Sequence, residues 1–224
     1  MAIHLTLLCA ATETSGREAV FGDEPAGKRL PGSMALPAFV THPLTIRAPS
    51  ARCARTAAAL GLEPTVEPAL RDLDYGRWKG HTRGEIAAMD PYGLSTWLTD
   101  PDAAPHGGES VRQLCDRAAD WLVKLPRGTR PTLAVVEPAV ARALLVHALS
   151  APARTFWHLD VRPLSSVSLV STDHGWQVTP AYEADRDSSR PAGSVPIAVN
   201  GAPFGSPRRH APVEQEKAAA PPLS

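Results

Sequence analysis

Short apolar runs alternate with longer amphipathic segments along the first 180 residues of the chain. Runs rich in apolar and β-branched residues predict strands, and segments with apolar residues spaced three and four apart predict helices. Alternation of the two predicts a three-layer α/β/α sandwich with a mainly parallel central sheet. The predicted strands cover residues 3–8, 44–48, 132–137 and 165–172, and the predicted helices cover residues 51–61, 108–125 and 139–150.

The helix predicted over residues 108–125 has the clearest pattern. Its apolar residues fall on one face, which we expect to be buried. Cys115 belongs to this face and is therefore predicted to be a core residue. The full set is Val111, Leu114, Cys115, Ala118, Trp121, Leu122 and Leu125.

The composition changes near residue 180. Residues 184–224 are rich in Pro, Ala, Gly and Ser and contain few aromatic residues. Such a segment offers too little apolar surface to offset the entropy of ordering. We therefore predict one domain over residues 1–183 and a disordered tail over residues 184–224.

The charge balance narrows the classes of partner. The chain has 224 residues, with Lys+Arg 23 and Asp+Glu 23, so its net charge is zero. This balance gives no electrostatic attraction to nucleic acid or to an anionic membrane. We expect a small-molecule or protein ligand of unknown identity, and the sequence does not indicate the oligomeric state.

The cysteines and the first residues indicate the compartment. Cys9, Cys53 and Cys115 lack C-x-x-C spacing, which predicts neither a disulfide framework nor a zinc site. No stretch approaches the roughly 18 apolar residues of a membrane span, and the start of the chain lacks the basic region of a signal peptide. We expect a cytoplasmic protein without a cofactor.

The ends of the predicted strands are the expected place for chemistry. In open parallel sheets, ligands bind beyond the carboxyl ends of the strands. The ends to examine are Leu8, Ala48 and Val136. Cys9 directly follows the first apolar run, which makes it a candidate nucleophile.

Four blocks of sequence resemble the histidine phosphatase superfamily, whose members have the phosphoglycerate mutase-like fold. "LRDLDYGRWKGHTRGEI" (70–86) is similar to the family pattern L-R-E-L-D-F-G-x-W-E-G-x-T-x-x-E-I. "APSARCARTAAALGL" (48–62) resembles S-P-L-x-R-A-x-Q-T-A, "HGGESVRQLCDRAADWLVKL" (106–125) the G-G-E-S helix, and "TLAVVEPAVARALL" (132–145) V-V-T-H-G-G-V-I-R-A-L. With the first strand, the resemblance spans about residues 3–178.

The resemblance implies a phosphohistidine mechanism. In the family the first strand ends in R-H-G-x-T, and its histidine attacks phosphorus. Two arginines and a second histidine hold the phosphoryl oxygens, and a carboxylic acid protonates the leaving oxygen. Such a site needs a neutral imidazole inside a cationic cradle.

The first motif departs from the family pattern. Matching Thr12 to the threonine of R-H-G-x-T places Leu8 at the arginine and Cys9 at the nucleophilic histidine. A register shifted by two, which matches Glu13 and Thr14 to an E-T ending, puts alanines at both positions. Neither register supplies a histidine or an arginine.

The other blocks match in part. The resemblance places Arg52 at the second arginine and Asp72 at the general acid, and it places Glu137 at the second histidine. Glu137 and Arg52 either form an internal ion pair, or Cys9, Asp72 and Glu137 form a pocket for a cation or an amine-bearing ligand. A carboxylate at the end of a buried strand requires one of these arrangements.

Four further residues lie in predicted loops and caps. Ser110 or Glu109 is expected to cap the long helix, and the resemblance adds a contact of Glu109 with the ligand. His81 and His106 flank the inferred pocket in loops, where the expectation is that they are solvated and the alternative is that either supplies an imidazole to the site.

These departures predict a degenerate member that lacks both catalytic histidines and the first arginine. The hypothesis is a pseudo-phosphatase with a ligand-binding or regulatory role. The alternative is a divergent phosphatase, or another hydrolase or transferase, that acts on a small phosphorylated metabolite. Cys9 or a water would then be the nucleophile and Asp72 the acid.

Overall fold

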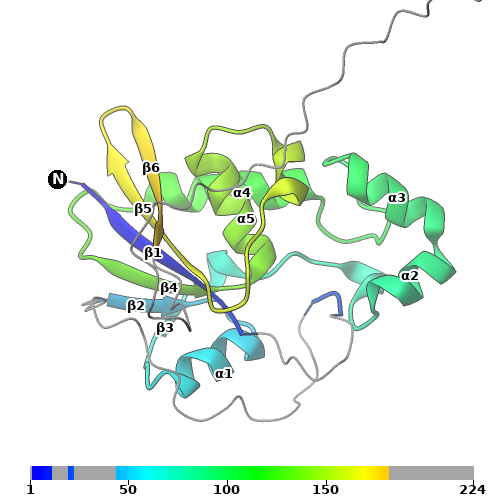
Figure 1. Ribbon diagram of the computed structural model, residues 1–224, viewed down its shortest axis with the longest axis horizontal. Coiled ribbons are helices and arrows are strands. Elements are labelled where there is room, and N and C mark those ends of the chain that lie inside the picture. Colours follow the sequence, from blue (N-terminus) through cyan, green and yellow to red (C-terminus); the bar gives the residue numbers. More distant parts are fainter. Residues whose placement is uncertain (1, 12–19, 23–43, 182–224) are drawn as a thin grey trace, which may run out of the picture.

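The computed structural model describes residues 2–11, 20–22 and 44–181 of the chain (Figure 1). The predicted tail over residues 184–224 and Thr12 lie outside these residues. Among the helices that are described, none is long and apolar enough to cross a membrane.

A six-stranded mixed sheet forms the centre of the molecule. Its order is β3-β2-β4-β1-β5-β6, in which the first four strands are mutually parallel and the last two are antiparallel to their neighbours. Cys9 lies opposite Val136 in the register of β1 and β4, so these two strands end side by side. The strands are β1 (His4–Cys9), β2 (Leu44–Arg47), β3 (Thr65–Val66), β4 (Thr132–Val136), β5 (Ser166–Thr172) and β6 (Gly175–Ala181).

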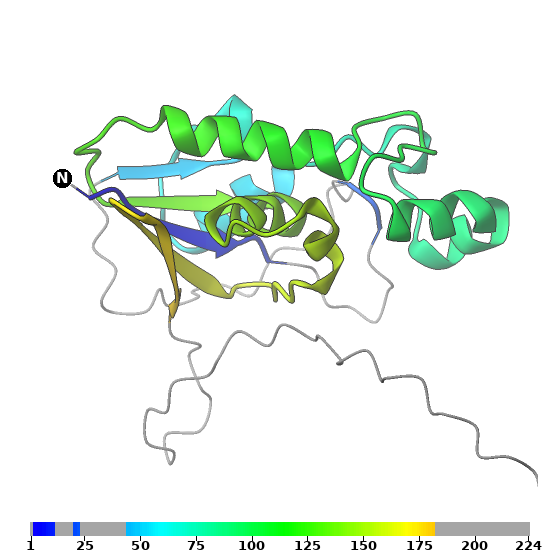
Figure 2. The ribbon, with the colours of Figure 1, turned by 90° about the horizontal axis from the view of Figure 1, so that it is seen from above.

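Helices cover both faces of the sheet. Figure 1 shows α1 (Ala51–Ala59) on one face and α4 (Val111–Lys124) and α5 (Pro138–Ala148) on the other. This arrangement confirms the predicted α/β class. In Figure 2, α2 (Arg83–Met89) and α3 (Pro91–Thr99) lie beyond the carboxyl ends of the strands. Three 3-10 turns complete the fold: Pro68–Leu70, Gly76–Trp78 and Ala153–His158.

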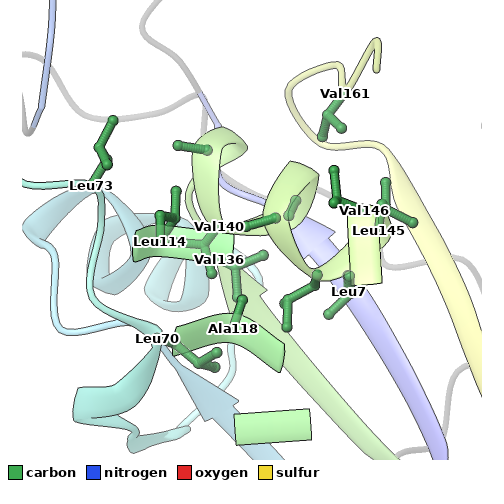
Figure 3. Close-up of a cluster of buried hydrophobic side chains, with 14 of the residues drawn as sticks. Leu7, Leu70, Leu73, Leu114, Ala118, Val136, Val140, Leu145, Val146 and Val161 are labelled. Carbon is green, nitrogen blue, oxygen red and sulfur yellow. The ribbon is translucent and has the colours of Figure 1, made fainter. Parts of the chain in front are cut away.

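The core lies between the sheet and the pair α4 and α5. Figure 3 shows Leu7 and Val136 of the sheet together with Ala118 of α4 and Val140 of α5. Cys115 is also buried, as its place in the apolar stripe predicted. Full burial of side chains of this size stabilises the fold by about 1.5–3 kcal/mol each.

Several boundaries differ from those predicted. The helix predicted from residue 108 begins at Val111, because Ser110 is its N-cap: its hydroxyl accepts a hydrogen bond from the Gln113 N–H at 3.2 Å. The strand predicted to residue 137 ends at Val136, because Glu137 is the N-cap residue of α5.

Two helices (α2 and α3), two strands (β3 and β6) and the three 3-10 turns were not predicted. Helices α2 and α3 are short, and no pattern of apolar residues was used to locate them. Their starts are nevertheless encoded locally: Thr82 and Glu85 form a reciprocal capping box, and the Asp90 carboxylate accepts from the Gly93 N–H at 2.9 Å. These capping residues were a usable signal.

Candidate functional site

The carboxyl ends of β1, β2 and β4 bring together three of the predicted site residues, Cys9, Arg52 and Glu137. Cys9 is the last residue of β1, and Glu137 directly follows β4. Arg52 lies in the first turn of α1, five residues after Arg47, which is the last residue of β2. The parallel arrangement places these ends at one edge of the sheet, as expected for a ligand site.

Glu137 and Arg52 form a buried ion pair. The Arg52 Nη1 and Glu137 Oε2 atoms are 3.2 Å apart. Glu137 is 0% exposed and Arg52 is 8% exposed, so both charges are removed from water. Of the two arrangements left open by the sequence, the internal ion pair is the one observed.

Ser50 fixes the second oxygen of the same carboxylate. Its hydroxyl donates to Glu137 Oε1 at 2.6 Å and accepts from the Cys53 N–H at 3.1 Å, so it also caps α1. The Cys53 thiol lies 3.8 Å from the same carboxylate oxygen. Sequence reasoning missed Ser50, although a serine immediately before a helical segment is a recognisable N-cap.

The guanidinium of Arg52 has a further fixed partner. Its Nη2 donates to the carbonyl oxygen of Gly22. The Thr56 hydroxyl donates to the carbonyl of Arg52 at 2.9 Å and accepts from the Ala11 N–H at 3.0 Å, which ties α1 to the chain after β1. Arg52 is thus held by a carboxylate and a carbonyl of this chain.

Cys9 is buried in the floor of the site. It is 1% exposed, and its backbone is bonded to the loop before β5, with the Leu164 N–H donating to its carbonyl at 3.0 Å. The pKa of Cys9 is raised from its ordinary value of 9.0 to about 12; burial is the largest cause, Glu137 adds to it, and Arg142 and Arg52 oppose it in part. The thiol is therefore neutral at physiological pH. Leu8 is buried and belongs to the hydrophobic core.

Asp72 lies on a loop that Arg117 holds in place. One Asp72 carboxylate oxygen accepts from the Leu73 N–H at 2.8 Å. The Arg117 guanidinium donates to the carbonyls of Ala69 at 2.7 Å, Arg71 at 3.0 Å and Asp72 at 3.4 Å. Arg117 therefore orders the backbone that carries Asp72.

Glu109 is the partner of that arginine. Arg117 Nε and Nη2 donate to the two oxygens of Glu109 at 2.9 and 2.8 Å. The cap of α4 is Ser110, and Glu109 is engaged with Arg117 beside the Asp72 loop. The structure gives Glu109 a role in supporting that loop.

Sequence reasoning missed Tyr75 and Arg142. Burial raises the pKa of Tyr75 well above its ordinary value; Asp72 raises it further, and Arg142 acts in the opposite direction. Tyr75 thus lies within electrostatic range of both residues, and Arg142 also acts on Cys9. Arg142 could have been noticed, since it coincides with the arginine of the family block V-V-T-H-G-G-V-I-R-A-L.

His106 is buried rather than solvated. It is 2% exposed, its ring lies 5.1 Å from that of Trp78, and its Nδ1 accepts from the Gly108 N–H at 3.0 Å. Burial lowers the pKa of His106, so the ring is held neutral. The prediction of a solvated loop residue was wrong, because the loop folds back onto Trp78. His81 is exposed, as expected.

The Glu137 charge is compensated within the site. Within the described ranges, no group of three His, Cys, Asp or Glu side chains is arranged to hold one. The Glu137 carboxylate is already compensated by Arg52. The arrangement is a neutralised pair beside an un-ionised thiol, with Tyr75, Asp72 and Arg142 around it.

Comparison with known proteins identifies the family. A family model of the histidine phosphatase superfamily (branch 1) matches residues 36–183. The chain is 34% identical over 114 residues to a bifunctional protein of Mycobacterium tuberculosis. The matched region covers 49% of this chain and 31% of that protein. It is 30% identical over 116 residues to the glucosyl-3-phosphoglycerate phosphatase of Mycolicibacterium vanbaalenii, covering 45% of this chain and 51% of that protein. The chain thus spans about a third to a half of the length of these relatives.

Solved structures share the fold. A mycobacterial glucosyl-3-phosphoglycerate phosphatase aligns with a TM-score of 0.62 at 21% identity, over 80% of this chain and 98% of that one. A putative alpha-ribazole-5'-P phosphatase from Escherichia coli aligns with a TM-score of 0.65 at 18% identity, over 82% and 97%. With the family match over most of the described residues, the chain belongs to the histidine phosphatase superfamily.

Proposed function

We propose that this protein is a pseudo-phosphatase of the superfamily, which binds a ligand in a binding or regulatory role and forms no phosphohistidine. The observation that carries this proposal is the buried Arg52–Glu137 pair at the end of β4. In the alignment of motifs, this is the place where a phosphatase would hold the phosphoryl oxygens.

The electrostatics of the pair support the proposal. An incoming phosphate would compete with Glu137 for Arg52 and would be repelled by the same carboxylate. At an effective dielectric constant of about 20, two unit charges about 4 Å apart interact by roughly 4 kcal/mol. A repulsion of that size lowers affinity for a phosphate dianion by orders of magnitude.

The state of Cys9 also supports it. With a pKa of about 12, only about one thiol in 10⁵ is ionised at pH 7. The thiolate is the nucleophilic form, so this burial suppresses attack on phosphorus. Removing Glu137 alone would not restore it, because desolvation is the larger cause.

The second candidate is a divergent phosphatase, or another hydrolase or transferase, that acts on a small phosphorylated metabolite. A relative named glucosyl-3-phosphoglycerate phosphatase favours it, as does the ordered loop that carries Asp72. In this mechanism a water or Cys9 attacks, and Asp72 protonates the leaving oxygen.

Phosphate binding and turnover separate the two candidates. We expect the wild-type protein to hydrolyse neither p-nitrophenyl phosphate nor glucosyl-3-phosphoglycerate, and intact-mass measurement to find no phosphoryl adduct on Cys9. Glu137→Gln keeps an oxygen for Ser50 and removes the negative charge, so it should bind inorganic phosphate more tightly than wild type in calorimetric titration. Turnover that is lost in Cys9→Ala or in Asp72→Asn would overturn the proposal.

We further propose that ligand binding belongs to a domain over residues 1–183 of a cytoplasmic protein, with residues 184–224 as a tail outside it. Limited proteolysis of the full chain should then cut first after residue 183 and leave a resistant fragment. First cuts within β4 or α5 would contradict this division.

A further inference from the structure

His106 is a titratable side chain enclosed by aromatic rings. It belongs to the loop between α3 and α4 and is 2% exposed. Its ring centre lies 5.1 Å from that of Trp78 and 6.2 Å from that of Tyr75, two residues of the turn that follows the Asp72 loop. The fold thus buries a group that in water gains a proton near pH 6.5.

The hydrogen bonds of the His106 ring require its neutral form. Nδ1 accepts from the Gly108 N–H at 3.0 Å, so this nitrogen carries no proton and the ring proton is on Nε2. Within the described residues, the buried Nε2 has no hydrogen-bond partner. A second proton would have to bind Nδ1, which faces the Gly108 donor. The imidazolium would therefore lose its bond to Gly108 without gaining an acceptor.

Backbone hydrogen bonds join residues 106–109 to residues 74–78, and these two segments form a junction. The Arg77 N–H donates to the His106 carbonyl at 3.0 Å, and the Glu109 N–H donates to the Asp74 carbonyl at 2.8 Å. The His106 ring packs against the side chains of the same turn. Repulsion at His106 would therefore act directly on the contact between the two segments.

The junction supports the loop that carries Asp72. Residues 74–78 follow this loop directly in the chain. Glu109, in the other segment, binds the Arg117 guanidinium at 2.9 and 2.8 Å, and Arg117 donates to the Asp72 carbonyl at 3.4 Å. Separation of the two segments would therefore loosen the Asp72 loop at the candidate site.

The groups around His106 favour its neutral form. Burial is the main reason that the pKa of His106 lies below its ordinary value of 6.5; Asp74 raises this pKa in part, and Arg77 lowers it. Tyr75 is neutral, because burial raises the pKa of its phenol well above the ordinary value.

The elements packed around the junction add little further charge. Phe21, and Trp97 of α3, pack against Trp78 and are uncharged. The charged side chains in the rest of the loop and at the start of α4 have other partners: Asp100 accepts from the Asp102 N–H, Asp102 pairs with Arg112, and Glu109 pairs with Arg117.

We propose that His106 is a pH-sensitive latch, which in its neutral form holds residues 106–109 against residues 74–78 and in its protonated form releases them. One proton from solvent binds Nδ1, and the Gly108 N–H loses its acceptor. The inference goes beyond the proposed function, because the latch would act whether the site only binds a ligand or also hydrolyses one.

The direction of the pH dependence follows from the burial of His106. In the open junction the ring is solvated and gains its proton near pH 6.5, whereas in the closed junction it gains the proton only at lower pH. Opening therefore takes up a proton between these two pH values. The closed junction keeps its full stability above pH 6.5, and its equilibrium constant for opening rises by up to about tenfold for each pH unit below that value.

Hydrogen exchange of the full chain tests the latch without a ligand. Protection factors, which correct for the intrinsic effect of pH on exchange, are measured in half-unit steps from pH 7.5 to pH 5.0. We expect the amides of Arg77, Gly108 and Glu109 to lose at least about threefold in protection below pH 6.5, while the amides of β4 lose less. Unchanged protection in the junction, or an equal loss in β4, would overturn the inference.

A matched pair of histidine variants identifies the titrating group. His106→Asn keeps an acceptor oxygen near the position of Nδ1 and cannot gain a proton, so protection of its junction should not depend on pH in this range. His81→Gln alters a histidine whose side chain is 42% exposed and should show the same loss as wild type. A wild-type loss in His106→Asn, or no loss in His81→Gln, would refute the role of His106.

If His106→Asn does not fold, NMR titration of the His106 ring in the wild-type protein decides. The midpoint should lie below pH 6.5, and the loss of protection should level off near that midpoint. A midpoint at or above pH 6.5 would contradict the latch. Because no substrate is present, phosphatase activity found in other assays would contradict the proposed function and leave this result intact.

Discussion

The Arg52 guanidinium and the Glu137 carboxylate lie 3.2 Å apart at the edge of the sheet where the carboxyl ends of β2 and β4 meet. Ser50 fixes the other carboxylate oxygen, so Glu137 has the place of an internal anion. The pair connects the first turn of α1 to the start of α5. Breaking this ion pair should therefore change both the stability of the fold and the charge of the ligand that the site prefers.

Removal of one partner should destabilise the protein strongly. Glu137→Ala leaves Arg52 buried without its counter-charge, and breaking such a pair costs about 3–5 kcal/mol. Urea unfolding followed by circular dichroism measures this loss. Arg112→Ala, which breaks an exposed ion pair with Asp102, is the control and should change stability little. If both variants lose a similar free energy of unfolding, the buried Arg52–Glu137 pair contributes no more to stability than the exposed Arg112–Asp102 pair, and the prediction is wrong.

Stability should decrease at alkaline pH. In the unfolded chain Cys9 ionises near its ordinary pKa of 9.0, whereas in the folded protein it stays neutral up to about 12. The neutral thiol therefore stabilises the fold fully below pH 9, and this contribution is lost as pH rises from 9 towards 12, by up to about 1.4 kcal/mol per pH unit. Urea unfolding between pH 7 and 10.5 should show the decline, and Cys9→Ala should reduce its slope. An equal slope in the variant would contradict the shifted pKa.

Gly76 should not tolerate a side chain. Its φ is +46°, and a Cβ there would lie 2.3 Å from the carbonyl oxygen of His106, so the turn and its neighbour would have to separate. We expect Gly76→Ala to cost about 3 kcal/mol or more, from strain and overpacking together. Gly61→Ala is the matched control, with φ +67° but open space around the Cβ. Thermal unfolding should show a clearly smaller loss for Gly61→Ala.

A lysine in place of Arg117 should not hold the Asp72 loop in its present conformation. A lysine retains the charge but cannot reach two oxygens of Glu109 and three carbonyls together. In Arg117→Lys, hydrogen exchange should accelerate at the amides around Asp72, while the amides of β4 retain their protection. Uniform acceleration throughout the protein would instead indicate global destabilisation.

The sequence by itself determined most of the sheet and three helices. Apolar runs and three-to-four spacing depend on local geometry, so they located β1, β2, β4, β5 and the helices α1, α4 and α5 to within a few residues. Helices α2 and α3 were missed because their local signal lies in capping residues such as Thr82 and not in a pattern of apolar residues. His106 was misjudged, because the sequence does not show that its loop packs on Trp78.

The candidate site, like the fold, was predicted from the sequence only in part. The motifs placed Cys9, Arg52, Asp72 and Glu137 at strand ends and loops, because parallel strands carry their functional residues at one edge. Only the tertiary structure decided that Glu137 pairs with Arg52 and that Tyr75 and Arg142 join the site. The sequence determines which charges the chain contains. Which charges compensate one another depends on distances and burial, and these are fixed only when segments far apart in the chain pack together.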